Sequence, residues 1–160
     1  MDFGEATAKI ADITLKIMEF YEKIMEIRNK FIEKINGYLE DIEQTVNNAI
    51  SQSKKWIEMQ INKITKKIND ALAGLKKKID DIIAQLRDWY ETVILNIKVS
   101  VVKAVFAILN QRIDRNGAIE IAKVIPHKPL DSMLPDFSLQ IAIPDPSQLI
   151  NVGPISLPRL

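Results

Sequence analysis

The stretch IMEIRNKFIEKINGYLEDI, residues 24–42, decides the fold of this chain. Its large apolar side chains recur at steps of three or four residues, at Ile24, Ile27, Phe31, Ile35, Tyr38 and Ile42. This spacing places them along one face of an α-helix, as in the seam of a coiled coil. The same steps continue in both directions, from Ile10 to Val93. The sequence therefore predicts a mainly α protein with a long, isoleucine-rich coiled-coil helix over residues 1–92.

The predicted seam is unbroken, although its period changes along the chain. Steps of three and four alternate up to residue 31, and an eleven-residue pattern of three, four and four follows. Eleven residues in three turns is close to the period of a relaxed helix, so we expect a nearly straight or weakly right-handed bundle. The residues that we assign to an oligomer seam are Ile10, Ile13, Ile17, Phe20, Ile24, Ile27, Phe31, Ile35, Ile42, Val46, Ile57, Ile61, Ile64, Ile68, Leu75, Ile79, Ile82 and Leu86.

The seam fits either a continuous rod or a helical hairpin. Residues 19–43 carry seven acids and four bases, whereas residues 54–78 carry eight lysines and two acids. A reversal at residues 47–53 would bring these opposite charges together. However, this segment has no Gly or Pro, and the seam passes through it at Ala49 and Ser53 without losing phase. The sequence thus favours the continuous rod over the hairpin.

The seam needs a cover, because a solitary helix would expose its whole apolar stripe to water. Isoleucine at both core positions of a coiled coil disfavours the parallel dimer and favours three or four strands. We therefore expect a homo-oligomer, with a trimer favoured, or a hetero-bundle with helices of another protein.

Residues 93–125 form an apolar transition region. Leu95, Ile97 and Val99 alternate with polar residues, a pattern typical of a strand, but residues 93–111 also fit a continuing helix. Both alternatives stay open at this point. Arg115-Asn116-Gly117 is typical of a tight hairpin turn, so the region contains a candidate β-hairpin.

Residues 126–160 hold all seven prolines of the chain. Proline excludes a regular helix and removes sheet donors, so we expect a β or extended segment. A strand is favoured over residues 137–143 within it, and another over residues 118–125 just before it. The segment is too apolar for a disordered linker, and such segments dock on other surfaces. The residues that we assign to this docking arm are Leu134, Phe137, Leu139, Ile141, Ile143, Ile155 and Leu157.

The inventory of chemically active side chains is thin. The chain has no cysteine and one histidine, His127, which we interpret as a solvated loop residue. The acids show no calcium-loop spacing, and the five glycines form no phosphate loop. We therefore expect no enzyme activity, no catalytic, cofactor-binding or metal-binding residues and no cofactor.

Charge and hydropathy restrict the partners. A formal net charge of +1 leaves no excess to neutralise a nucleic acid, so we expect no nucleic-acid partner. The N-terminal residues lack the pattern of a signal peptide, which predicts a protein made in the cytoplasm. The most apolar stretch, residues 93–109, is interrupted by Asn96, Lys98 and Lys103, so we expect no membrane span.

The layout of an isoleucine-rich coiled-coil helix, a short β end and a proline-rich tail resembles small structural proteins of tailed-phage virions, of the tail, baseplate or fibre-anchoring type. The resemblance covers the whole chain but involves no sequence motif, so it assigns no residue a role. It implies a non-enzymatic rod whose arm docks into a larger complex of structural proteins, and incorporation into a virion. Two alternatives are an amphipathic protein of membrane surfaces or pores, and an adaptor that wraps a folded partner with its arm.

Overall fold

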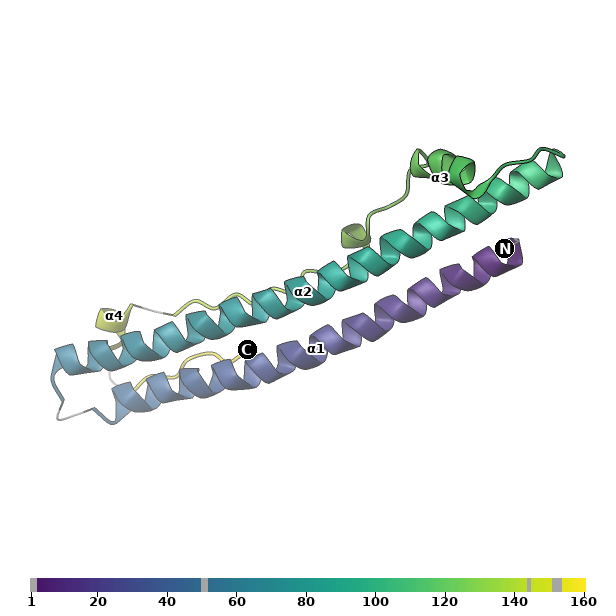
Figure 1. Ribbon diagram of the computed structural model, residues 1–160. Coiled ribbons are helices and arrows are strands. Elements are labelled where there is room, and N and C mark those ends of the chain that lie inside the picture. The colour runs from purple at the N-terminus through teal and green to yellow at the C-terminus, as the bar shows by residue number, and fades with distance from the viewer. Residues whose placement is uncertain (1–2, 50–51, 144, 151–153) are drawn as a thin grey trace. The chain divides into compact units, whose positions relative to one another are not determined.

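The computed structural model describes residues 3–49, 52–143, 145–150 and 154–160. Two long helices dominate it, α1 (Phe3–Asn47) and α2 (Lys54–Ile108), and three short elements follow: α3 (Arg115–Lys123), the 3-10 turn η1 (Leu130–Met133) and α4 (Pro146–Ile150) (Figure 1). No residue within the described ranges lies in a β-strand. The prediction of a mainly α protein with a long helix is therefore confirmed.

The prediction of one continuous helix over residues 1–92 is wrong, because the chain reverses between Asn47 and Lys54. Ser53 begins α2 as its N-cap, since its hydroxyl accepts a hydrogen bond of 3.1 Å from the Trp56 amide. Ala49 is buried in the connection, with 7% of its surface exposed. The seam keeps its phase across the reversal because this turn residue also packs in the core.

The chain forms two compact units of equal residue number. Unit 1 consists of Met1–Lys23 and Asp80–Asp136, and unit 2 consists of Ile24–Ile79 and Phe137–Leu160. Each long helix contributes one part to each unit. The boundaries predicted at residues 92 and 125 do not separate these units, because contact between α1 and α2 groups residues that are distant in sequence.

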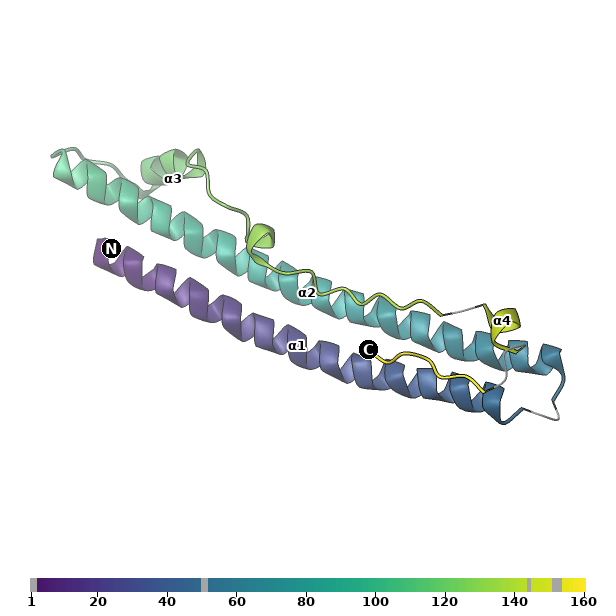
Figure 2. The same ribbon diagram turned by 180° about the vertical axis from the view of Figure 1, so that it is seen from behind.

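The core of unit 2 lies between α1 and α2, which run antiparallel there. Four isoleucines, Ile35, Ile42, Ile61 and Ile68, are completely buried in it. Lys78 of α2 lies 5.3 Å from the centre of the Phe31 ring of α1 and adds a cation–π contact between the two helices. Residues 137–143 lie along α2, and residues 154–160 lie along α1 (Figures 1 and 2). Unit 2 is thus a helix pair covered by two segments from the end of the chain.

Unit 1 has two cores on α2. The first joins Ile13 of α1 to Leu86 of α2 and to Leu130 of η1. The second joins α2 to α3 through Val99, Val102, Ala118 and Ala122, with Leu95, Phe106, Ile113 and Ile119 beside them. In this unit α2 therefore packs on different neighbours along two of its faces.

These two faces explain why the strand alternative for residues 93–101 is wrong. Ile97 belongs to the core that α2 shares with α1 and η1, whereas Val99 belongs to the core that it shares with α3. Two residues are about 200° apart on a helix, so such residues point to opposite sides. The two apolar stripes together produce the alternation that resembles a strand.

The hairpin predicted at Arg115-Asn116-Gly117 is also wrong, because these residues form the first turn of α3. The Asp114 carboxylate caps this helix by accepting a hydrogen bond of 2.7 Å from the Gly117 amide. Before it, α2 ends at Ile108, and Asn110, two residues later, has a φ of 57° in the left-handed region. The amides of Asn110 and Gln111 donate to the carbonyls of Ala107 and Phe106, which is the Schellman arrangement of a helix end.

The strands predicted at residues 118–125 and 137–143 are absent from the structure. Residues 118–123 belong to α3, and residues 137–143 have no regular secondary structure. The second segment has no neighbouring strand with which to pair, since both long elements of unit 2 are helices. Its alternating side chains pack instead on the core of that unit, with Phe137 buried to 5% exposure.

Candidate interaction surfaces

The predicted seam residues mostly line the cores that the chain forms with itself. Eleven of the eighteen are buried, namely Ile13, Ile24, Ile35, Ile42, Ile57, Ile61, Ile68, Leu75, Ile79, Ile82 and Leu86. Six are half-buried, namely Ile17, Phe20, Ile27, Phe31, Val46 and Ile64. Ile10 stays exposed, at 54%. The cover that the seam requires thus comes largely from the reversal of the chain.

The predicted docking-arm residues also lie on their own chain. Phe137 and Leu157 are buried, and the others, Leu134, Leu139, Ile141, Ile143 and Ile155, are half-buried against the two cores. Leu134 belongs to unit 1, and the other six belong to unit 2. The arm therefore docks, but the surface that receives it in the structure is the helix pair.

Three polar side chains of α1 bind the last segment of the chain, and we call this arrangement the C-terminal clasp. Asn47 contacts the backbone of Ile155 twice: its Oδ1 accepts from the Ile155 amide at 2.8 Å, and its Nδ2 donates to the Ile155 carbonyl at 3.1 Å. One turn before, Glu43 accepts a hydrogen bond from the Leu157 amide. Asn36 accepts from the Leu160 amide at 3.0 Å. Side chains of one helix face thus bind backbone groups of three residues of this segment.

Glu43 also forms the ion pair of the clasp. Both Arg159 guanidinium nitrogens Nη1 and Nη2 donate to its carboxylate at 2.8 Å, in a bidentate arrangement. The Arg159 guanidinium, and next the Leu157 amide, lower the pKa of the Glu43 carboxyl below its ordinary value, because both stabilise the charged form. Only 17% of the Glu43 side chain is exposed. A carboxylate this shielded favours a cationic partner at the position of Arg159.

The clasp was not predicted, although its spacing is visible in the sequence. Asn36, Glu43 and Asn47 are seven and four residues apart, so they share one helix face. Such polar residues on a helix are typical of a solvated surface, and their partners are between 108 and 124 positions away along the chain. Nothing local in the sequence indicates that pairing.

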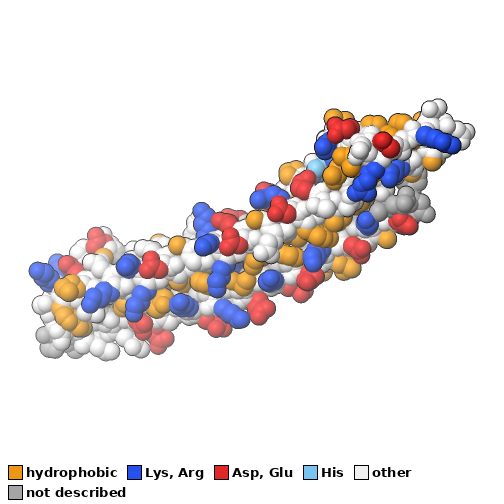
Figure 3. Space-filling model, viewed as in Figure 1, with side chains coloured by type: hydrophobic (Ala, Val, Ile, Leu, Met, Phe, Trp, Pro, Cys, Tyr) orange, Lys and Arg blue, Asp and Glu red, His pale blue; other side chains and the backbone are white. Residues whose placement is uncertain are grey.

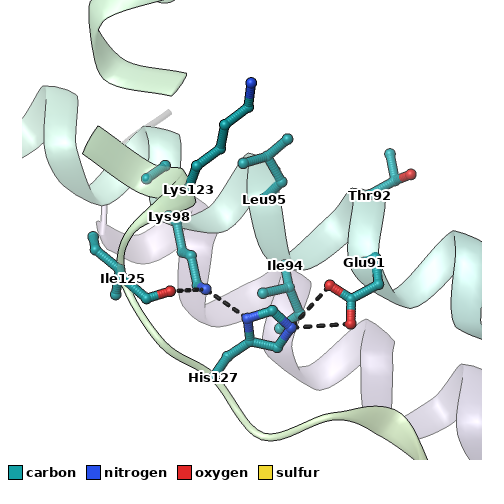
Figure 4. A pocket seen from close by; sticks show the side chains of 9 residues that line it. Glu91, Thr92, Ile94, Leu95, Lys98, Lys123, Ile125 and His127 are labelled. Carbon is teal, nitrogen blue, oxygen red and sulfur yellow. Dashed lines mark hydrogen bonds and ion pairs between the residues drawn. The ribbon is translucent and has the colours of Figure 1, made fainter. Parts of the chain in front are cut away.

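An open pocket of about 350 Å³ lies between α2 and the end of α3 in unit 1. Figure 4 shows His127 at its rim between Glu91 and Lys98. Its Nε2 lies 3.0 Å from Glu91 Oε1, and its Nδ1 faces the Lys98 ammonium, which also donates to the Ile125 carbonyl. These contacts fasten the chain after α3 onto α2. The sequence predicts a solvated loop residue at His127, but its ring is held by these contacts, and its partner Glu91 lies 36 residues away along the chain.

Two further contacts fasten the same stretch of unit 1. The Tyr90 hydroxyl donates to the Lys128 carbonyl at 2.8 Å, and burial raises the pKa of this tyrosine. The Arg87 Nη2 donates to both carboxylate oxygens of Asp131, at 3.0 and 3.1 Å. Together with the His127 contacts, they show that polar groups in this unit hold the chain in place.

Neither a metal site nor a membrane span is found within the described residues. No three of their His, Asp and Glu side chains come together in a way that could hold a metal ion. None of their helices combines the length and apolar character needed to cross a bilayer.

Exposed apolar side chains concentrate in unit 1. Among the described residues, eleven of the fourteen exposed large hydrophobic residues belong to this unit, namely Ile10, Leu15, Met18, Tyr21, Val105, Ile108, Leu109, Ile121, Val124, Ile125 and Met133. Hydrophobic side chains are visible at the surface between charged ones in Figure 3. We call the α1 residues Ile10, Leu15, Met18 and Tyr21 the apolar α1 face. Within unit 1, it is the largest set of such residues on one helix.

Comparisons with family models, curated proteins and solved structures found no match for this chain. They neither support nor contradict the resemblance to structural proteins of tailed phages, which stays a prediction.

Proposed function

We propose that the protein is a non-enzymatic structural or assembly protein, and that the apolar α1 face of unit 1 is the surface through which it joins other helices. The concentration of exposed apolar side chains in one of two equally sized units carries this proposal. Large hydrophobic residues scattered singly on a surface are ordinary, whereas a gathered set indicates a contact surface.

The spacing of the face supports a helical partner. Ile10, Met18 and Tyr21 lie eight and three residues apart, which places them on one side of α1, and Leu15 flanks Met18 one turn before. Leu15 is 65% exposed and Met18 is 55% exposed, so a contact would remove a large apolar area from water. An added helix could pack its side chains between these residues as helices do in bundles.

The assembly that follows is a homo-oligomer or a coiled-coil bundle with another structural protein. The preference for a trimer comes from the seam isoleucines, most of which the chain itself buries, so that preference does not extend to this face. In either case the chain serves as one component of a larger complex. The resemblance in layout to structural proteins of tailed phages makes a virion tail or baseplate the setting that we propose for it.

The substitution Met18→Glu tests this function. A charge in the centre of the apolar α1 face should be excluded from a helix–helix contact, so the oligomer should shift towards the monomer by at least tenfold in dissociation constant. Light scattering coupled to size-exclusion chromatography measures the mass of both proteins. Ala84→Glu, at an exposed position of α2 in the same unit, is the matched control and should leave the mass unchanged.

Two outcomes would contradict the proposal. The wild-type chain could be a monomer at all concentrations and fail to join a helical partner, or Met18→Glu could behave like the control. Binding of the wild-type chain to lipid vesicles that Met18→Glu abolishes would assign the same face to a membrane surface instead.

A further inference from the structure

The C-terminal clasp binds its segment mainly through the backbone of that segment. Asn47 accepts a hydrogen bond from the Ile155 amide and donates one to the Ile155 carbonyl, and Glu43 accepts one from the Leu157 amide. The side chains of these two residues pack on the core of unit 2. This combination of backbone hydrogen bonds with apolar anchors two residues apart is the way in which proteins recognise extended peptides.

Charge gives the site its selectivity. The shielded Glu43 carboxylate pairs with Arg159, and the nearby Glu40 also favours the positive charge of that guanidinium. A segment with an apolar residue, a second apolar residue two positions on and an arginine two positions later therefore fits the site. Residues Ile155, Leu157 and Arg159 supply this pattern.

The backbone of the segment is conformationally restricted before it binds. Pro154 and Pro158 flank the two apolar anchors, and each proline restricts the backbone to extended conformations. A segment with fewer conformations loses less entropy when it is ordered. Its binding therefore depends less on a covalent connection to the helix that binds it. None of the contacts with α1 requires that the segment and the helix belong to the same copy of the chain.

An empty site loses its contacts to water, whereas an exchanged site keeps them. Release of the segment breaks the ion pair of Glu43 and the backbone hydrogen bonds of Asn47. If two copies exchange their segments, each site is filled again by the same residues and every contact is kept. Exchange of identical elements is a low-cost route by which proteins associate.

We propose that the α1 residues Asn36, Glu43 and Asn47 form a binding site for an extended apolar-x-apolar-x-arginine segment, and that in the assembled protein a second copy of this chain supplies it. This inference deepens the proposed assembly function, since it names a contact between copies. It involves unit 2, however, whereas the proposed assembly face belongs to unit 1.

Two single charge reversals, mixed together, test the exchange. Glu43→Lys spoils the site and leaves the segment intact, and Arg159→Glu spoils the segment and leaves the site intact. In either variant alone, like charges meet within the chain, so the amides of Ile155 and Leu157 should exchange with solvent at least tenfold faster than in the wild type. In an equimolar mixture, the segment of Glu43→Lys can enter the intact site of Arg159→Glu, and protection of its Ile155 and Leu157 amides should return. The segment of Arg159→Glu can pair with the lysine of the other site, where only its Ile155 amide should regain protection, because lysine cannot accept from the Leu157 amide.

Hydrogen exchange measured by NMR, with one variant labelled with nitrogen-15 at a time, reports each segment separately. The double variant Glu43→Lys/Arg159→Glu restores the ion pair within one chain and should protect the Ile155 amide without mixing, whereas the Leu157 amide has lost its acceptor and stays fast. Circular dichroism of both single variants verifies that the helices are intact. If Glu43→Lys has lost helix, Asn47→Ala takes its place, and if Arg159→Glu has lost helix, Arg159→Ala takes its place; in either mixture the chain with the intact site should regain a protected segment.

The inference is overturned if the mixture exchanges as fast as the separate variants do, because the segment then binds only within its own chain. That result leaves the apolar α1 face untouched, since the face is tested by the mass of Met18→Glu. Conversely, recovered protection with an unchanged mass for Met18→Glu would remove the proposed assembly face and keep the exchanged segment.

Discussion

The two units of this chain have the same number of residues and are built on the same two helices, but they differ in the segments that cover these helices. In unit 2, residues 137–143 and 154–160 cover the helix pair, and three exposed large hydrophobic residues remain among those described. In unit 1, α3 and η1 cover α2 and leave the apolar α1 face in water. The same two helices thus produce one region whose apolar surface is largely covered by the end of the chain and one in which a set of apolar side chains stays exposed.

The largest expected effect is on the stability of the core of unit 2. Ile61 is completely buried between the helices, so Ile61→Ala should lower the free energy of unfolding by about 2–5 kcal/mol through lost burial and a cavity. Urea unfolding measures this change. Ile61→Val, which removes one methyl group, should cost about 0.5–1.5 kcal/mol. A loss below that of the valine variant would show that the core around residue 61 is loosely packed.

A smaller effect concerns the cover of α2 in unit 1. Asp114→Ala removes the carboxylate that caps α3, and loss of an N-cap costs about 1 kcal/mol. We expect faster amide exchange throughout Arg115–Lys123, with little change in unit 2. Asp114→Ser keeps a hydroxyl acceptor and should retain most of the protection. Equal exchange in both variants would mean that packing on Val99 and Val102, not the cap, holds α3 in place.

The smallest effect is a pH response confined to unit 2. Because the pKa of Glu43 is lowered in the folded chain, the clasp stabilises the fold at pH values above the ordinary range of glutamate. This contribution is lost as the pH falls through the lowered value. NMR titration should show the Ile155 and Leu157 amides losing protection together with protonation of Glu43. Glu43→Gln should remove the pH dependence, and a persistent response would assign it to another group.

Much of the helical core was predictable because burial repeats with the helix period. The buried isoleucines at positions 24, 35, 42, 61 and 68 all belong to the seam that spacing alone identifies. The reversal was not predictable from that seam, since Ala49 keeps the phase while it lies outside both helices. The Ser53 cap is the local signal that was available for the start of α2.

The strand predictions failed for two different physical reasons. Around residues 95–101, two helical stripes overlap and imitate the alternation of a strand. Residues 137–143 do alternate, but their apolar side chains satisfy the core of a helix pair and no strand lies beside them. The alternation of apolar and polar residues therefore indicates which side chains are buried. It does not indicate whether the backbone pairs with a strand.

The candidate surfaces were predictable in part. Apolar residues of the arm were identified from composition, but the receiving side chains Asn36, Glu43 and Asn47 are ordinary polar residues of a helix, and long-range folding alone gives them partners. Of the apolar α1 face, only Ile10 belongs to the predicted seam. Ile10 and Ile13 share unit 1, yet Ile10 is exposed and Ile13 is buried, a difference that spacing alone does not predict.

The way in which Asn47 and Glu43 hold the backbone has a practical use. Ser156 and Pro158 alternate with the anchoring side chains and are exposed, so neither position contributes a side chain to the apolar anchors. Because the chain has no cysteine, Ser156→Cys would provide a single thiol for a fluorophore or spin label beside the clasp. The short stretch Pro154–Leu160 could likewise be fused to an unrelated protein as a portable tag that the helix pair captures.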